Sequence, residues 1–208
     1  MKVYIGTANW GKEYGINKVK VSPKEIDKIL KVADAHNCGI ETAWDYNCME
    51  ALRGLGDQFD IIFKGDEISQ FQVADDLIGE VMPMKHHPPY GKWEDKSIYN
   101  PSDIGWGLCE FPYNIIDQRF SLKIVDPPNV PDLFIARSVF IQGLAFKMPD
   151  FHGIPFYHLC WNFVRNNLNI DGIVVGVDTA AQLEDIFRIP QYSIDYSKIG
   201  GEGWIKKL

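Results

Sequence analysis

Residues 22–46, SPKEIDKILKVADAHNCGIETAWDY, hold the pattern that decides the fold. Ser22 offers a capping hydroxyl, Pro23 suits the first helical position and Glu25 stands at the third, so a helix is expected to begin here. Apolar residues then recur at helical spacing until the helix ends near the start of Gly39–Ala43. That apolar run is too short for a helix and is typical of a buried strand. A helix followed directly by a buried strand indicates an α/β fold.

Working outward, seven further short runs predict strands along the rest of the chain. They are Val3–Gly6, Phe59–Lys64, Val81–His86, Lys96–Tyr99, Gly107–Phe111, Leu133–Arg137 and Gly172–Val175, with helical segments at Cys48–Leu55 and Ser69–Glu80. Eight strands with helices interspersed on 208 residues predict a compact (β/α)8 TIM barrel, with residues 1–208 forming a single domain.

Two connections are too short for the usual crossover helix. Parallel neighbours need a crossover of about a dozen residues or more, but ten residues separate His86 from Ser97 and seven separate Tyr99 from Gly107. We therefore expect the fourth and fifth helices to be reduced or missing. A doubly wound open sheet is the alternative architecture, although no Gly-x-Gly-x-x-Gly follows the first strand to support it.

Composition and charge exclude several classes of function. With 21 Lys and Arg against 28 Asp and Glu, the chain has a net charge of −7, which disfavours nucleic acid as a partner. No run approaches the 18 or more apolar residues of a membrane span, and the chain begins in a strand-like run without a secretory leader. The four cysteines are far apart, without Cys-x-x-Cys, and we expect them to be reduced. These features predict a cytoplasmic protein.

Polar side chains follow several of the predicted strands, at the end of a parallel barrel where active sites form. Glu41 and Tyr46, Lys64 and His86 lie at or just after three strand ends. A lysine beside a tyrosine lowers the pKa of the phenol, an acid keeps the lysine charged, and a histidine can bind a substrate oxygen. Together they predict a general acid for a carbonyl. The adjacent His87 suggests a metal, but no third ligand has suitable spacing, so no metal is expected.

Five motifs in order make the chain resemble the aldo-keto reductases. They are Ile5–Ile16 (IGTANWGKEYGI), Glu41–Tyr46 (ETAWDY), Phe111–Arg119 (FPYNIIDQR), Arg137–Leu144 (RSVFIQGL) and Val174–Leu183 (VVGVDTAAQL). This resemblance implies a (β/α)8 barrel that reduces aldehydes and ketones with NADPH.

The resemblance also implies roles for individual residues. Tyr46 would be the general acid, Lys64 and Glu41 would tune it, and His86 would orient the substrate carbonyl, with Glu41 standing where the family has aspartate. Residues that would bind the cofactor are Thr7, Ser97, Glu110, Asn114, Arg137, Ser138, Gln142, Gly176 and Gln182.

Three departures from the family pattern leave the cofactor open. Glu41 is one methylene longer than aspartate, which changes its reach to Lys64. Glu110 stands where many members have a glutamine for the nicotinamide carboxamide, and an ionised acid cannot donate a hydrogen bond. Asp178 and Gln182 replace the basic residues that hold a 2′-phosphate, and an aspartate repels phosphate. NADP(H), NAD(H) and no cofactor at all are therefore alternatives.

The leading hypothesis is an NAD(P)H-dependent oxidoreductase acting on the carbonyl of a small metabolite or sugar-like molecule. The alternative is a barrel that has lost the reaction and binds a ligand or a partner. A hydrolase or lyase using Glu41 and His86 is a third hypothesis, and it leaves Lys64 and Tyr46 without a role. The sequence does not fix the substrate or the oligomeric state.

Overall fold

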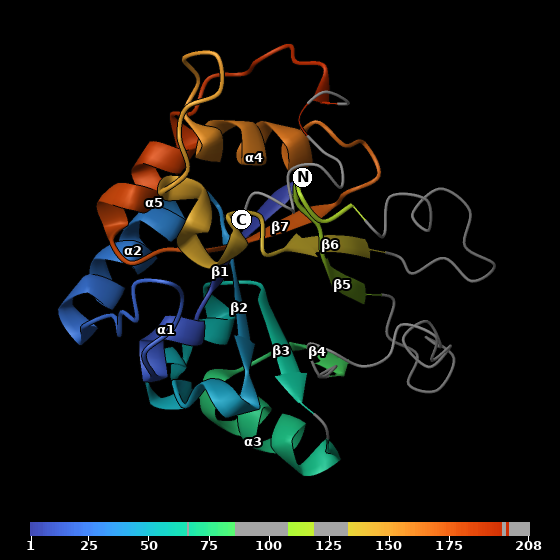
Figure 1. Cartoon of the computed structure of the whole chain (residues 1–208). Coiled ribbons are helices and arrows are strands. Elements are labelled where there is room, and N and C mark those ends of the chain that lie inside the picture. Colours follow the sequence, from blue (N-terminus) through green and yellow to red (C-terminus); the bar gives the residue numbers. More distant parts are fainter. Residues whose placement is uncertain (66, 86–107, 119–132, 197–198, 200–208) are drawn as a thin grey trace.

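The computed structural model describes residues 1–65, 67–85, 108–118, 133–196 and 199 (Figure 1). Within these residues, a parallel seven-stranded sheet has the order β4-β3-β2-β1-β7-β6-β5. Its strands are β1 (Lys2–Gly6), β2 (Gly39–Ala43), β3 (Ile61–Gly65), β4 (Met82–Lys85), β5 (Leu108–Pro112), β6 (Leu133–Arg137) and β7 (Gly172–Gly176). The helices are α1 (Ala8–Gly11), α2 (Pro23–Ala35), α3 (Ile68–Ile78), α4 (Phe156–Arg165) and α5 (Ala180–Phe187), with 3-10 turns at Trp44–Tyr46, Met49–Leu52, Leu55–Asp57 and Ile141–Phe146.

The strand order distinguishes a barrel from an open sheet. β1 pairs with β2 on one side and with β7 on the other. In a doubly wound sheet the second half of the chain starts beside β1 and builds outward. Here the second half starts at the far edge and builds inward through β5, β6 and β7. This is the order of a (β/α)8 ring opened between β4 and β5.

The predicted strand Lys96–Tyr99, which would fall between β4 and β5, lies outside the described residues. The two connections expected to lack helices fall largely in the same undescribed range, 86–107. The other seven predicted strands are confirmed to within about two residues, and two of them, β2 and β6, have the predicted bounds.

A small apolar cluster fills the inside of the curved sheet. Met82 from one edge strand and Leu108 from the other pack on the same cluster, so the sheet curls until its edges share a core. A side chain at Gly39 would collide with the Tyr4 ring, and a Cβ at Gly172 would lie 2.9 Å from it. Glycine on both flanking strands therefore makes room for this ring. The cluster comprises Tyr4, Ile62, Ile135 and Val174, with Met82, Leu108 and Leu133 against it.

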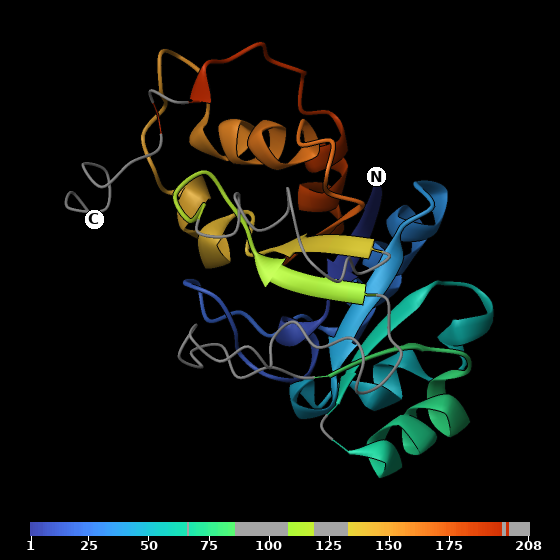
Figure 2. The same cartoon turned by 90° about the vertical axis from the view of Figure 1, so that its right-hand side faces the viewer.

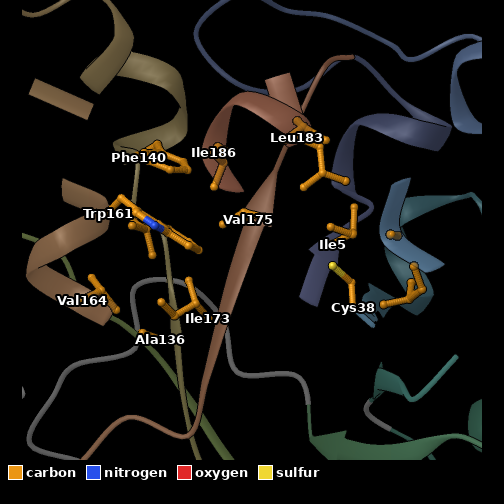
Figure 3. Close-up of a cluster of buried hydrophobic side chains, with 14 of the residues drawn as sticks. Ile5, Cys38, Ala136, Phe140, Trp161, Val164, Ile173, Val175, Leu183 and Ile186 are labelled. Atoms are coloured by element: carbon orange, nitrogen blue, oxygen red, sulfur yellow. The ribbon is translucent and has the colours of Figure 1, made fainter. Parts of the chain in front are cut away.

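The larger core lies between the outside of the sheet and the helices that pack on it, of which α2, α4 and α5 gather on one side of the sheet in Figure 1, as Figure 2 shows from another direction. Residues alternating with the inward ones supply its sheet side, as the two-residue period of a strand requires. Figure 3 shows Ile173 and Val175 of β7 facing Trp161 of α4, with Leu183 of α5 near Ile5 of β1. All five side chains are at least 95% buried.

Local sequence explains how the helices begin. Ser22 accepts a hydrogen bond from the backbone N–H of Glu25 at 3.3 Å, and Pro23 opens α2 as predicted. The predicted helical segment Cys48–Leu55 consists of two short 3-10 turns, which are separated by Arg53 and by Gly54 at a φ of +70°. This left-handed backbone at Gly54 interrupts a continuous helix.

Two further features concern the described part of the chain. None of its helices combines the length and the apolar character needed to cross a membrane. Cys38, Cys48 and Cys160 are free thiols in the interior, as predicted for reduced cysteines.

Candidate active site

A second layer of inward-facing residues, most of them polar, lies two residues beyond the small apolar cluster on each strand. Because a strand has a two-residue period, these positions continue the inward-facing rows of the apolar cluster. All strands are parallel, so the polar layer lies at their carboxyl ends, where barrel active sites form. Its members are Gly6, Glu41, Lys64, Glu110, Arg137 and Gly176.

Lys64 stands at the centre of this layer with three partners. Its ammonium contacts the carboxylate of Glu41, donates to Glu110 Oε1 at 3.2 Å and donates to Tyr46 Oη at 3.1 Å. Three acceptors match the three N–H bonds of an ammonium. The Lys64 side chain is 8% exposed, and those of Glu41 and Glu110 are 3% and 2% exposed. The longer reach of Glu41, compared with an aspartate, therefore does not prevent its contact with Lys64.

Arg137 extends the ionic layer to β6. Its Nε lies 3.4 Å from Glu110 Oε1, and its Nη1 donates to Ser138 Oγ at 3.3 Å. Two carboxylates thus face two cations, so the layer is neutral when all four groups are charged. The side chain of Arg137 is 29% exposed, which makes it the most exposed of the four charged side chains. Glu110 Oε2 is buried and has no hydrogen-bond partner among the described residues.

Burial and mutual charge shift the pKa values of the cluster. Burial opposes the charge of Lys64, but Glu110 and Glu41 outweigh it and hold the pKa of this ammonium well above its usual range. Burial raises the pKa of Glu41 to about 7, while Lys64 acts in the opposite direction. Burial and the Glu41 carboxylate likewise raise the pKa of Tyr46 above its ordinary value of 10. The expected lowering of the Tyr46 pKa was wrong, because Lys64 offsets only part of these two effects.

Tyr46 is positioned by the loop that follows β1. It ends the 3-10 turn Trp44–Tyr46 directly after β2, and Gly11 ends α1 against the same turn. A side chain at Gly11 would collide with the Tyr46 carbonyl oxygen, so only glycine fits. Lys12 Nζ donates to Asp45 O at 3.0 Å and lies 5.3 Å from the centroid of the Tyr46 ring. The tyrosine is therefore held between two lysines.

Two predicted cofactor residues, Thr7 and Asn114, make hydrogen bonds that join segments of the chain. Thr7 is fully buried and donates to Thr42 Oγ1 at 2.8 Å. Asn114 Oδ1 accepts from the backbone N–H groups of Ile116 and Asp117, and its Nδ2 donates to the Ser138 carbonyl oxygen at 3.2 Å. Asn114 thus ties the loop after β5 to the loop after β6.

The loop after β6 has a strained backbone. Ser138, Ile141 and Gln142 have φ values of 60°, 54° and 54°. This conformation is costly for a β-branched residue such as Ile141, and strain of this kind clusters at functional sites. The carbonyl oxygen of Gln142 accepts from the backbone N–H of Ile16 at 3.0 Å, which joins this loop to the loop after β1.

The remaining predicted residues lie at the end of β7, in α5 or outside the described range. A Cβ at Gly176, the last residue of β7, would meet no described atom within 4 Å. Gln182 Oε1 accepts from the backbone N–H groups of Asp178 and Thr179, and this capping box starts α5. His86 and Ser97 lie outside the described residues. Within the described ranges, no three His, Cys, Asp or Glu side chains are grouped so as to hold a metal ion.

Sequence reasoning missed two contacts of these strand ends. It assigned Glu110 only to cofactor binding, whereas Glu110 also contacts Lys64, 46 residues away in the sequence. The signal was present, because Glu110 follows inward-facing Leu108 by two residues. It also missed Glu25, whose Oε1 accepts from the Ala180 backbone N–H at 2.9 Å across 155 residues. No local pattern indicates that contact.

Comparison with known proteins was informative only at the level of structure. No protein-family model matches the sequence, and no curated protein matches it either. Several solved structures share the fold at low sequence identity. One is a Pseudomonas aeruginosa protein proposed to be an aldo-keto reductase, with 13% identity and a TM-score of 0.64 over 90% of this chain and 88% of that chain. Another is a Bacillus halodurans aldo-keto reductase in its holo form, with 11% identity and a TM-score of 0.63 over 94% of this chain and 89% of that chain. A third is a Gluconobacter oxydans glycerol dehydrogenase, with 12% identity and a TM-score of 0.60 over 95% of this chain and 89% of that chain. The chain therefore has the barrel fold of the aldo-keto reductases.

Proposed function

We propose that this protein is an NAD(P)H-dependent reductase of small carbonyl compounds, with Tyr46 as its general acid. The observation that carries the proposal is the contact of one buried lysine, Lys64, with both Tyr46 Oη and Glu41 at the strand ends of the barrel. A lysine so placed can stabilise the phenolate that remains when the tyrosine gives up its proton. The aldo-keto reductases that share the fold make a carbonyl the natural acceptor of that proton.

The polar layer fits a nicotinamide cofactor. A carboxamide group offers one N–H₂ donor and one carbonyl acceptor. Among the described residues, Glu110 Oε2 is a buried acceptor without a hydrogen-bond partner, and Arg137 beside it is a partly exposed donor. No described atom lies within 4 Å of a Cβ built at Gly176, which leaves room at the end of β7. When bound, a reduced nicotinamide supplies the hydride.

Residues of the chain donate the proton and stabilise the charge that it leaves behind. With its pKa raised above 10, Tyr46 keeps its proton at neutral pH and can donate it from Oη to the carbonyl oxygen. The negative charge that develops on Oη then lies beside the Lys64 ammonium, which the two carboxylates keep charged. Reduction needs the protonated tyrosine and oxidation needs the phenolate. The site is therefore better suited to reduction than to oxidation at neutral pH.

Other parts of the site follow from the resemblance. His86 is proposed to orient the substrate carbonyl. Thr7, Ser97, Asn114, Ser138, Gln142 and Gln182 are proposed to surround the cofactor together with Glu110, Arg137 and Gly176. Three free, buried cysteines are consistent with a protein of the reducing cytoplasm.

Titration of the purified protein with NADPH and with NADH, followed by nicotinamide fluorescence, tests the proposal. Saturable binding of either one is expected, and Tyr46→Phe should bind the cofactor with unchanged affinity while losing turnover on an aldehyde panel. If neither cofactor binds at millimolar concentration, the proposal is overturned in favour of a non-catalytic barrel.

A further inference from the structure

A carboxylate of the chain itself occupies the start of α5. Free backbone N–H groups at a helix N-terminus normally attract anions such as phosphate. Here Glu25, from the first turn of α2, accepts from the Ala180 backbone N–H at 2.9 Å. Its other oxygen accepts from Lys28 Nζ at 2.8 Å, and its side chain is 21% exposed. α2 and α5 lie side by side in Figure 1, so the contact joins neighbouring helices.

The neighbouring N–H groups at this helix start are also taken. Gln182 Oε1 accepts from Asp178 N at 2.7 Å and from Thr179 N at 3.3 Å. Thr179 Oγ1 accepts from Gln182 N at 3.2 Å. With Glu25 on Ala180, four backbone donors have partners within the chain. A phosphate arriving here would have to displace these groups.

The side chains that surround this helix start offer acceptors. Asn9 Nδ2 donates to the Val177 carbonyl oxygen and to Asp178 Oδ1, both at 3.0 Å. Asn9 is 5% exposed, and its Oδ1 is buried without a hydrogen-bond partner among the described residues. Glu25 and Asp178 add two carboxylates that accept hydrogen bonds at the same turn. A phosphate brings only acceptors and negative charge, whereas a hydroxyl brings a donor, which Asn9 Oδ1 lacks among the described residues.

We propose that Glu25 and Asp178 make the loop between β7 and α5 select against a 2′-phosphate, so that the protein binds NADH in preference to NADPH. This inference rests on the proposed function. Phosphate groups in barrel enzymes lie at the loops after the last two strands and at a helix N-terminus. The loop after β7 and the start of α5 have that position here. In dinucleotide-binding folds, an acidic residue on the ribose 2′-hydroxyl is the usual mark of NAD specificity.

The experiment measures dissociation constants of NADH and NADPH by fluorescence or calorimetry for the wild type and for Glu25→Gln. The wild type should bind NADH at least about tenfold more tightly, because like charges in contact are costly. Glu25→Gln keeps an oxygen for the Ala180 N–H but removes one negative charge, so the preference should shrink by several fold. Asp178→Asn should act in the same direction. Asp185→Asn, which makes the same charge change on the exposed far side of α5, should leave the ratio unchanged.

A measurement on the wild type alone guards against variants that fail to fold. Added salt screens repulsion, so the NADH preference should decrease as ionic strength rises. An equal affinity for the two cofactors, a preference for NADPH, or a ratio unmoved by Glu25→Gln in a folded variant overturns the inference and leaves the reductase proposal standing. Failure of both cofactors to bind overturns the reductase proposal and, with it, this inference.

Discussion

The polar layer of the barrel and the start of α5 both gather charged side chains at strand ends, but they balance charge differently. In the layer, each buried ion has an opposite partner, with Lys64 and Arg137 facing Glu41 and Glu110. At α5, Glu25 pairs with Lys28, whose side chain is 54% exposed, whereas Asp178 accepts a hydrogen bond from the neutral amide of Asn9. Desolvation explains the difference, because an unmatched charge is costly only where water is excluded. Solvent-exposed sites can therefore keep a surplus of one sign and use it to select ligands.

The largest effect is expected from a variant that removes the proposed proton donor, Tyr46, and leaves the four charges of the polar layer in place. Tyr46→Phe keeps the ring but deletes the hydroxyl that accepts from Lys64. Turnover should fall by about 10² to 10⁴, the usual contribution of a general acid. Steady-state reduction of an aldehyde substrate at saturating cofactor measures this. Turnover within about threefold of the wild type would remove Tyr46 from the mechanism, since a lost general acid costs at least about 10².

The next largest effect is expected from a variant that breaks the charge balance of the polar layer. Lys64→Met leaves Glu41 and Glu110 buried and facing each other, and removing one partner of a buried ion pair costs about 3–5 kcal/mol. Urea denaturation at neutral pH should show this loss of unfolding free energy. Lowering the pH should restore part of it, because the carboxyl groups take up protons.

A double variant provides the control for that measurement. Lys64→Met combined with Glu41→Gln removes one charge of each sign and should be more stable than Lys64→Met alone. A single variant that is as stable as the wild type at neutral pH would contradict the view that the buried charges are matched by necessity.

Sequence patterns predicted most of the fold because they report local geometry. The bounds of β2 and β6 and the start of α2 follow from apolar runs and one capping sequence, each contained within a few residues. The Tyr46, Lys64 and Glu41 group was also predicted, because strand ends of a parallel barrel meet at one edge.

The rest depends on the closed shape. Whether Lys64 lowers the pKa of Tyr46 depends on burial and on Glu110, and neither is visible before β5 is placed across the barrel from β3. The contact of Glu25 with Ala180 needs α2 and α5, which are far apart in the sequence, to become neighbours. The balance of charges depends on three-dimensional packing. Short motifs therefore predict which charged residues come into contact, but not the direction in which their pKa values shift.

A smaller effect concerns the protonation of Glu41. Its pKa is raised to about 7 in the folded protein, above its ordinary value of 4.5. Between pH 4.5 and about 7, Glu41 therefore keeps its proton in the folded protein, whereas the unfolded chain has released it. Stability from this group is present below about pH 4.5 and falls as pH rises through about 7. The change should be on the order of 3 kcal/mol.

The difference in unfolding free energy between wild type and Glu41→Gln, followed from pH 4.5 to 7.5, isolates this group. Glutamine cannot ionise, so the wild type should lose stability relative to the variant as pH rises. A difference that grows in favour of the wild type over this window would show that the contact with Lys64 outweighs burial.

The smallest effect tests the exposed side of the comparison. Thr179→Ala removes the hydroxyl that accepts from Gln182 N at α5, and Ser22→Ala removes the equivalent cap of α2. Loss of a side-chain cap costs about 1 kcal/mol, and similar shifts of the urea midpoint are expected for both variants.

The two variants should respond differently to anions, because Thr179→Ala frees a backbone donor at the turn where Glu25 and Asp178 lie. If free phosphate then stabilises Thr179→Ala more than Ser22→Ala, occupied donors rather than the two carboxylates keep phosphate away from α5. Equal responses to phosphate would instead leave the surplus negative charge as the cause.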